Sequence, residues 1–267
     1  MSADGGPPIG RLFDLSGRVA LITGAGGHLG FPMACALAEA GCQVIAASRN
    51  HANARKSAAR LGGAQAGRHA AVAIDYFNEV SIKRGFTSAL EQAGHIDILV
   101  NNGHEVLGSD WHTITAAQFN RQLAHATGYF LLARLVRDHA VQSRRPASII
   151  LLGSMYGQVA SYPGVYRDAA AASPAAYQTL KAGIIHLTRH LAVYWARDRV
   201  RVNCLSPGPF PTATAPAKVI RRLRAKSPMY RMGEPYEVKG AVVFLASDAA
   251  SYVTGHNLAV DGGWTAW

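Results

Sequence analysis

The sequence has little of what metal-dependent or extracellular proteins usually contain. Its 267 residues include only three cysteines, Cys35, Cys42 and Cys204, which cannot all pair with one another and show no metal-ligand spacing. The eleven histidines are scattered and form no HExxH-type cluster, so we expect no catalytic metal. Each cysteine is expected to fill a gap in the core, which suits a reducing compartment.

Long hydrophobic stretches are also lacking. No run of residues is apolar enough over sufficient length to cross a bilayer. The first eight residues have neither the basic nor the hydrophobic part of a signal peptide. These absences predict a cytoplasmic protein with no membrane partner.

Acidic residues are scarce relative to basic ones. Asp and Glu number 16 against 27 Lys and Arg, which gives a formal net charge of +11. Such an excess fits nucleic-acid binding, attraction of anionic cofactors and substrates, or a solvated basic surface. Because the charge is spread along the chain and is not gathered into a tail or interleaved with aromatics, we expect a solvated surface and no nucleic-acid partner.

No linker rich in Pro, Gly or Ser divides the chain, and no internal repeat is present. The hydrophobic share of 49% is enough for a sizeable core. We therefore expect a single domain over residues 1–267, with a flexible lead at 1–14 that ends in an apolar anchor at Leu12 and Phe13.

Strand patterns alternate with helix patterns along the chain. The expected strands are 18–23, 43–48, 69–75, 96–101, 147–153, 200–206 and 258–260, and the clearest helices are 29–40, 118–139 and 174–197. This alternation predicts an α/β fold of the Rossmann type, a doubly wound parallel sheet with helices on both faces. Ligands bind such a sheet outside the carboxyl ends of its strands.

A glycine-rich turn separates the first expected strand from the first expected helix. It reads Gly24-Ala25-Gly26-Gly27-His28-Leu29-Gly30. Glycines let the backbone turn tightly and approach a pyrophosphate, which the helix N-terminus then favours electrostatically. Its place inside the first βαβ unit predicts a dinucleotide site rather than a mere loop.

The end of the second strand indicates which dinucleotide is bound. A carboxylate there binds the ribose hydroxyls of NAD, whereas a nearby arginine accommodates the additional phosphate of NADP. The sequence has Ser48-Arg49-Asn50 and no acid, which favours NADP(H) over NAD(H), although Arg49 is also compatible with a solvated surface charge. Asp75, at the end of the third strand, either accepts from the adenine amino group or caps a turn.

Tyr177 and Lys181 lie one helical turn apart. Ser173 predicts the N-cap of this helix and Pro174 its first turn, so the two side chains share one face. An ammonium group favours a neighbouring phenolate, so we expect the pKa of Tyr177 to fall. Tyr177 would then serve as a general acid for a carbonyl oxygen or a base for an alcohol. Alone, such a pair is equally typical of ordinary helix side chains.

Together with further motifs, these residues resemble the classical short-chain dehydrogenase/reductase family over nearly the whole chain. The matching motifs are Thr23-Gly24-x5-Gly30, Asn101-Asn102-Gly103, Ser154, Tyr177-x3-Lys181, Asn203, Pro207-Gly208-x3-Thr212, Thr254-Gly255 and Asp261-Gly262-Gly263. The resemblance implies hydride transfer between a nicotinamide and a carbon bearing oxygen. It implies that Tyr177 transfers the proton and that Ser154 hydrogen-bonds the substrate carbonyl. Lys181 would lower the pKa of Tyr177 and hold the nicotinamide ribose.

The resemblance also implies where the cofactor binds. The implied residues are Thr23, Gly24, Gly26, Gly27, His28, Leu29, Gly30, Ser48, Arg49, Asn50, Asp75, Tyr76, Asn101, Asn102, Gly103, Tyr177, Lys181, Pro207, Gly208, Phe210 and Thr212. The segment 207–212 would embrace the nicotinamide, with Thr212 near its carboxamide. Residues 209–232 would form the substrate loop.

Three histidines depart from the family's pattern. His28 replaces the middle glycine of the turn, where its side chain either disturbs the phosphate site or contacts a phosphate. His104 stands at the last glycine of the usual Asn-Asn-Ala-Gly motif. His125 stands where the family has an asparagine that holds a relay water, which makes it a fourth candidate catalytic residue. The alternative is a helix histidine satisfied by a backbone carbonyl.

The segment between Ser154 and Tyr177 is longer than the family norm. The additional residues lie in 157–173 and include Tyr162 and Tyr166. Because both ends of this loop are fixed at the active site, we expect it to line the substrate pocket rather than to form a surface insertion.

The segments 12–17 and 48–50 resemble the gluconate 5-dehydrogenase-like branch, whose related members act on sugars. We therefore expect an NADP(H)-dependent oxidoreductase that interconverts a secondary alcohol and a ketone, acting on a sugar or sugar acid. The alternatives are a ketoreductase for another carbonyl, such as a 3-oxoacyl thioester, and a non-catalytic NADP-binding protein. Likeness to the family implies a homotetramer or dimer. Trp264 and Trp267 are expected to dock in a subunit interface or over a neighbouring active site.

Overall fold

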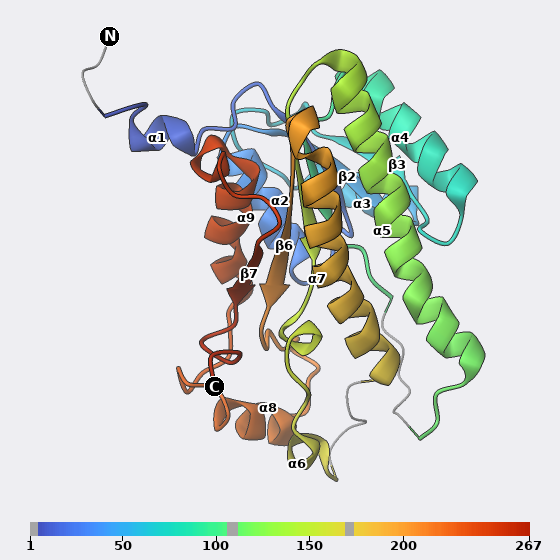
Figure 1. The fold of residues 1–267 in the computed structure, drawn as a ribbon, viewed down its shortest axis with the longest axis vertical. Helices are drawn as coiled ribbons and strands as arrows, with labels where there is room; N and C mark the ends of the chain where they lie inside the picture. Colours follow the sequence, from blue (N-terminus) through green and yellow to red (C-terminus); the bar gives the residue numbers. More distant parts are fainter. Residues whose placement is uncertain (1–4, 106–111, 169–173) are drawn as a thin grey trace.

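The strand segments assemble into one parallel sheet (Figure 1). The computed structural model describes residues 5–105, 112–168 and 174–267. The strands are β1 (Val19–Thr23), β2 (Gln43–Ser48), β3 (Ala70–Ala73), β4 (Ile98–Asn101), β5 (Ala147–Leu152), β6 (Val200–Pro207) and β7 (Asn257–Val260). They pair in the order β3-β2-β1-β4-β5-β6-β7, so the winding direction reverses between β1 and β4. The predicted doubly wound parallel sheet is confirmed.

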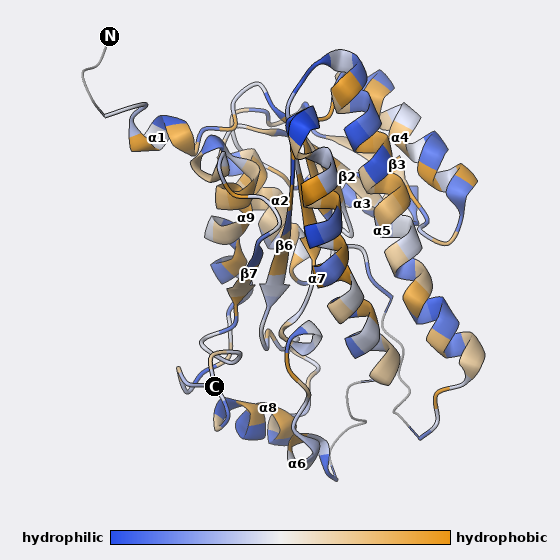
Figure 2. Cartoon of the chain, viewed as in Figure 1, coloured by the Kyte–Doolittle hydropathy of each residue, from blue (hydrophilic) through white to orange (hydrophobic). Residues whose placement is uncertain are grey.

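Helices cover both faces of the sheet, as Figure 1 shows. One face packs against α4 (Glu79–Ala93), α5 (Ala116–Ser143) and α7 (Ala175–Trp195), and the other against α2 (Gly30–Glu39), α3 (His51–Ala58) and α9 (Lys239–Ala246). Side chains of a strand alternate between the faces, so in β1 Leu21 enters the first layer and Ala20 and Ile22 the second. Figure 2 shows apolar colouring on the strands and mixed colouring along the helices.

Helices α3 and α4 were not among the helices expected from the sequence. Each begins after an asparagine whose side chain accepts a hydrogen bond from a backbone N–H three residues later, Asn50 from Asn53 and Asn78 from Ser81. Helix α7 begins at Ala175 with Pro174 as its N-cap, one residue later than expected, and Ser173 lies outside the described residues. No described helix is long and apolar enough to cross a membrane.

The N-terminal segment is held by a different residue from the one expected. Leu15 is fully buried in the layer of α2, whereas α1 (Ile9–Leu12) has no buried residue and Phe13 is only partly covered. Leu15 is therefore the apolar anchor.

A third, smaller apolar cluster lies beyond the carboxyl ends of the strands. It joins α6 (Pro163–Tyr166), α8 (Ala217–Arg224) and the C-terminal residues, which lie together in Figure 1. Trp264 is 1% exposed, and its ring meets that of Tyr162 edge-on with centroids 5.6 Å apart. The expectation that Trp264 docks on another subunit is wrong, because the indole is buried within its own chain. Trp267 is exposed.

Candidate active site

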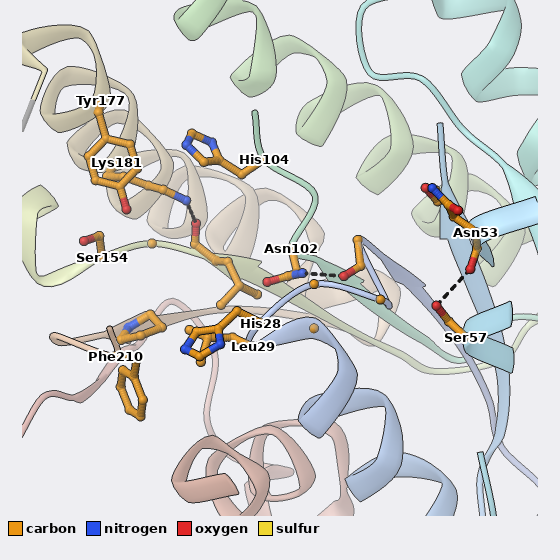
Figure 3. Close-up of a pocket in the computed structure, with 18 of the residues that line it drawn as sticks. His28, Leu29, Asn53, Ser57, Asn102, His104, Ser154, Tyr177, Lys181 and Phe210 are labelled. Carbon is orange, nitrogen blue, oxygen red and sulfur yellow. Dashed lines mark hydrogen bonds between the residues drawn. The ribbon is translucent and has the colours of Figure 1, made fainter. Parts of the chain in front are cut away.

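The carboxyl ends of β1, β2, β5 and β6 meet at one cleft of about 680 Å³. The glycine-rich turn forms one wall, and Ser154, Tyr177 and Lys181 lie opposite it (Figure 3). Ser48 closes the cleft near the end of β2, and Phe210 near the end of β6. The cleft lies beside the reversal point of the sheet, where doubly wound folds bind their ligands.

The backbone of the glycine turn is fixed by close contacts. Gly24 has φ of +63°, a conformation that favours glycine, and a side chain at Gly30 would overlap the carbonyl oxygen of Gly24. The side-chain nitrogen Nδ2 of Asn102 donates to the backbone carbonyl oxygens of Thr23 and Gly24, at 3.1 and 3.2 Å. His28 is exposed at the rim of the cleft beside Leu29 and Phe210 (Figure 3). Its side chain therefore lies at the mouth of the cleft and not inside the turn.

Several predicted cofactor residues form hydrogen bonds with one another at the strand ends that underlie the cleft. The hydroxyl oxygen of Thr23 accepts the backbone N–H groups of Asn102 and Gly103, both at 3.0 Å. The hydroxyl of Tyr76 lies 2.5 Å from that oxygen and 2.7 Å from Oδ1 of Asn101. Asn101 is fully buried and also donates to a backbone carbonyl of α5. Tyr76 and Asn101 thus stabilise the strand ends beneath the cleft.

The end of β2 presents a basic rim. Ser48 lines the cleft, and Arg49 is half exposed and forms an ion pair with Glu105 at 3.1 Å. Lys56 and Arg60 of the α3 region also line the cleft. Neither was among the predicted residues, although their spacing of four along a helical segment is a signal that the sequence contains.

Asn50 and Asp75 have local structural partners. Asn50 caps α3, as described above, and Asp75 accepts a hydrogen bond from the backbone N–H of Phe77 at 3.1 Å. Asp75 thus caps a turn, one of its two expected roles, and it also lines a small hollow beside Ser48 and Arg49.

Ser154 and Tyr177 lie where the cleft meets a second cavity. Ser154 follows β5, and Tyr177 and Lys181 project from the first turns of α7. Burial raises the pKa of Tyr177 above its usual value of 10, although a hydrogen bond with Ser154 opposes this. The expectation that this pKa falls is therefore wrong. Nζ of Lys181 donates instead to the carbonyl oxygen of Leu152 at 2.7 Å and lies 5.6 Å from the centre of the Tyr177 ring.

Lys181 is itself buried, and desolvation lowers its pKa from 10.5 to about 8. Because of this lowered pKa, Lys181 gives up its proton more readily than a surface lysine does. The backbone carbonyl of Leu152 fixes the position of Nζ next to the phenol (dashed in Figure 3).

Both ring nitrogens of His125 have backbone partners. Nε2 accepts the N–H of Glu105 at 2.9 Å, and Nδ1 faces the carbonyl oxygen of Gln122 at 3.0 Å. These contacts match the alternative of a helix histidine satisfied by a backbone carbonyl. Between His125 and Tyr177 lies His104, whose ring centroid is 5.0 Å from the first ring and 5.2 Å from the second. His104 therefore belongs to the site, and its departure from the family motif was the signal for it.

The second cavity, called the pocket from here on, has a volume of about 390 Å³ and opens beside Ser154 and Tyr177. Tyr156 and Tyr166 line it, and their hydroxyl oxygens lie 2.6 Å apart. The prediction that the long loop lines the substrate pocket is thus supported for Tyr166, while 169–173 lie outside the described residues.

The segment after β6 reaches both cavities. Gly208 and Phe210 line the cleft and the pocket, and Pro207 lines the cleft. Thr212 is exposed, and its hydroxyl lies 3.0 Å from that of Thr214. Thr212 is therefore not among the residues that line the two cavities, although its neighbour Pro211 lines the pocket.

The sequence model described as Enoyl-(Acyl carrier protein) reductase matches residues 24–265. The chain is a short-chain dehydrogenase/reductase. Family membership makes it an oxidoreductase that acts on CH–OH groups and uses a nicotinamide cofactor.

Curated relatives of this short-chain dehydrogenase/reductase act on different alcohols. Galactitol 2-dehydrogenase (L-tagatose-forming) of Cereibacter sphaeroides is 34% identical over 277 residues, covering 96% of this chain and 98% of that protein. Cis-4-hydroxycyclohexanecarboxylate dehydrogenase of Sinomonas cyclohexanicum is 34% identical over 254 residues, covering 93% and 97%. A solved gluconate 5-dehydrogenase from Burkholderia cenocepacia J2315, in complex with NADP and tartrate, superposes with a TM-score of 0.86 at 29% identity, covering 97% of this chain and 99% of that one.

Proposed function

We propose that this protein is an NADP(H)-dependent oxidoreductase that interconverts a secondary alcohol and a ketone, with Tyr177 as the general acid and base. The main supporting observation is the position of Ser154 and Tyr177, which lie at the junction between the cleft and the pocket. A group that bridges the two cavities at this point contacts both hydroxyls.

The cleft fits a nicotinamide dinucleotide. Gly26 and Gly27 leave the rim of the turn free of side chains, and the turn leads into the N-terminus of α2, which favours a pyrophosphate. Lys181, Pro207 and Gly208 would hold the nicotinamide end. When bound, the nicotinamide supplies the acceptor or donor of the hydride.

The protein's own residues manage the proton and the orientation. Ser154 would donate a hydrogen bond to the substrate oxygen and position it next to the hydroxyl of Tyr177. In the reduction of a ketone, the neutral phenol of Tyr177 would give its proton to the developing alkoxide, and in alcohol oxidation the phenolate would accept it. The buried ammonium group of Lys181 would stabilise that phenolate.

The preference for NADP(H) rests on the charge around the end of β2. Arg49, Lys56 and Arg60 are available there to a 2′-phosphate, and the strand ends in Ser48 where an NAD site would have a carboxylate. Glu105 neutralises part of the charge of Arg49. The relatives support two substrate classes. One is polyols and sugar acids, and the other is cyclic hydroxy acids.

Assembly into a homo-oligomer is also proposed. Val193 and Tyr194 on the outer side of α7 are 77% and 70% exposed, which suits a covered surface. Size-exclusion chromatography with light scattering gives the state directly, and a monomer would contradict the proposal.

The function is tested by following NADPH absorbance with the purified protein. We expect NADP⁺ to be reduced in the presence of a secondary alcohol and NADPH to be oxidised with the matching ketone. A fluorescence titration with NADPH and NADH is run in parallel. Tight binding without turnover of any alcohol or ketone would favour the non-catalytic alternative.

A further inference from the structure

Most of the described residues that line the pocket beside Ser154 and Tyr177 are apolar. His104 and Gln122 add polar side chains to the two catalytic hydroxyls. The remaining wall includes Met155, Phe210 and Leu223 together with prolines and an alanine. The hydroxyls of Tyr156 and Tyr166 also face the cavity region, but they are hydrogen-bonded to each other.

His104 has one ring nitrogen engaged and one available. The side-chain nitrogen of Gln122 lies 3.5 Å from Nδ1 of His104, and when it donates to Nδ1 the ring hydrogen is on Nε2. No hydrogen bond from a described residue engages Nε2, and the ring lines both cavities. Burial and the charge of Lys181 lower the pKa of His104 to about 3, so the ring is neutral and Nε2–H is a single donor.

Packing holds this donor near the reacting atoms. The His104 ring meets the Tyr177 ring at 65° with centroids 5.2 Å apart, and His125 supports its other side. The glycine that the family has at this position offers no side-chain donor. Because His104 and Tyr177 line the same pocket, a donor on this ring is available to a substrate whose oxygen contacts Tyr177.

We propose that His104 is a specificity-determining residue that donates through Nε2–H to an oxygen on the carbon adjacent to the reacting one, in a substrate whose remaining body is hydrocarbon. This inference rests on the proposed dehydrogenase function and narrows its substrate class. A linear polyol has a hydroxyl on every carbon, and each hydroxyl placed against an apolar side chain without a partner is unfavourable. The pocket therefore selects a compact vicinal diol or hydroxyketone over a sugar alcohol.

Three probes test the proposal, each with the protein and NADP⁺. Cyclohexanol and cis-cyclohexane-1,2-diol differ by one vicinal hydroxyl, and galactitol is the linear polyol. We expect kcat/KM for the diol to exceed that for galactitol at least about tenfold. His104→Phe keeps the ring but removes the donor, and should lower the ratio of kcat/KM for diol to cyclohexanol about 10- to 100-fold. His104→Gln restores a donor and should recover much of the ratio. His186→Phe, on the exposed side of α7, is the matched control.

Calorimetric binding of the same probes to the NADP⁺ complex separates the two hypotheses. Oxidation of alcohols with galactitol preferred, or with a diol-to-cyclohexanol ratio unchanged in His104→Phe, would overturn the inference and leave the dehydrogenase function standing. Binding of the diol that weakens in His104→Phe, without oxidation of any probe, would support the inference and contradict the dehydrogenase function. Failure of both cyclic alcohols to bind would refute the assigned substrate class.

Discussion

The ammonium group of Lys181 is anchored on the carbonyl oxygen of Leu152, at 2.7 Å, while its distance to the centre of the Tyr177 ring is 5.6 Å. The carbonyl group at the end of β5 thus fixes the amino group of Lys181, while α7 carries both Lys181 and Tyr177. Desolvation of the phenol raises the pKa of Tyr177, and the hydrogen bond with Ser154 does not overcome it. The free protein consequently holds its acid in the proton-donating form.

The titration of Tyr177 follows from this arrangement. Because burial raises its pKa above 10 in the folded protein, we expect less phenolate from this residue than from an exposed tyrosine at pH 10. The measurement is the difference in tyrosinate absorbance between the wild type and Tyr177→Phe during a pH titration without cofactor. The folded state retains this proton when the unfolded chain has lost it, so Tyr177 makes the protein less stable as pH rises beyond 10. A phenolate signal near pH 8 would restore the lowered pKa expected from the sequence.

Removing the hydroxyl of Tyr177 should abolish turnover without disturbing the cleft. Tyr177→Phe deletes the transferable proton alone, so we expect kcat to fall by about 10²- to 10⁴-fold and the Kd for NADPH to change little. Steady-state assays and fluorescence titration measure the two quantities. Tyr252→Phe alters a fully exposed tyrosine and is the control. Retention of most of kcat would exclude Tyr177 as the acid and base.

The role of Arg49 is tested by comparing the two dinucleotides. Arg49→Ala removes a cation from the end of β2, so we expect the Kd for NADPH to rise about tenfold while that for NADH stays nearly constant. Arg55→Ala, an exposed arginine of α3 that is not among the cleft residues, is the charge-matched control. Equal weakening of both dinucleotides would mean that Arg49 does not recognise the 2′-phosphate. Lys56 and Arg60 would then be the next variants.

Trp264 should matter for stability rather than for assembly. Trp264→Ala empties a fully buried site beneath α6 and α8, so we expect the free energy of unfolding to fall by about 3 kcal/mol. Denaturant titration measures this change, with exposed Trp267→Ala expected to stay within about 0.5 kcal/mol of wild type. Unchanged stability together with an altered elution volume would return Trp264 to a subunit interface.

The local patterns of the chain were sufficient for much of the fold. All seven strands were predicted within a few residues, because parallel strands read as short apolar runs closed by Gly, Asn, Ser or Asp. Helices α3 and α4 were harder to predict, since their first turns are marked only by Asn50 and Asn78. An asparagine cap resembles an ordinary turn residue until the helix behind it packs on the sheet.

The sequence by itself determined the α/β architecture, the glycine turn, and the order of Ser154, Tyr177 and Lys181 along the chain. Tertiary structure alone decided the electrostatics and neighbours of these groups. Burial raised the pKa of Tyr177, Trp264 turned inward, and His104 came to lie against the ring of Tyr177. The physical reason is that strand and helix periodicities are local, whereas desolvation and ring contacts depend on segments that are distant in the chain.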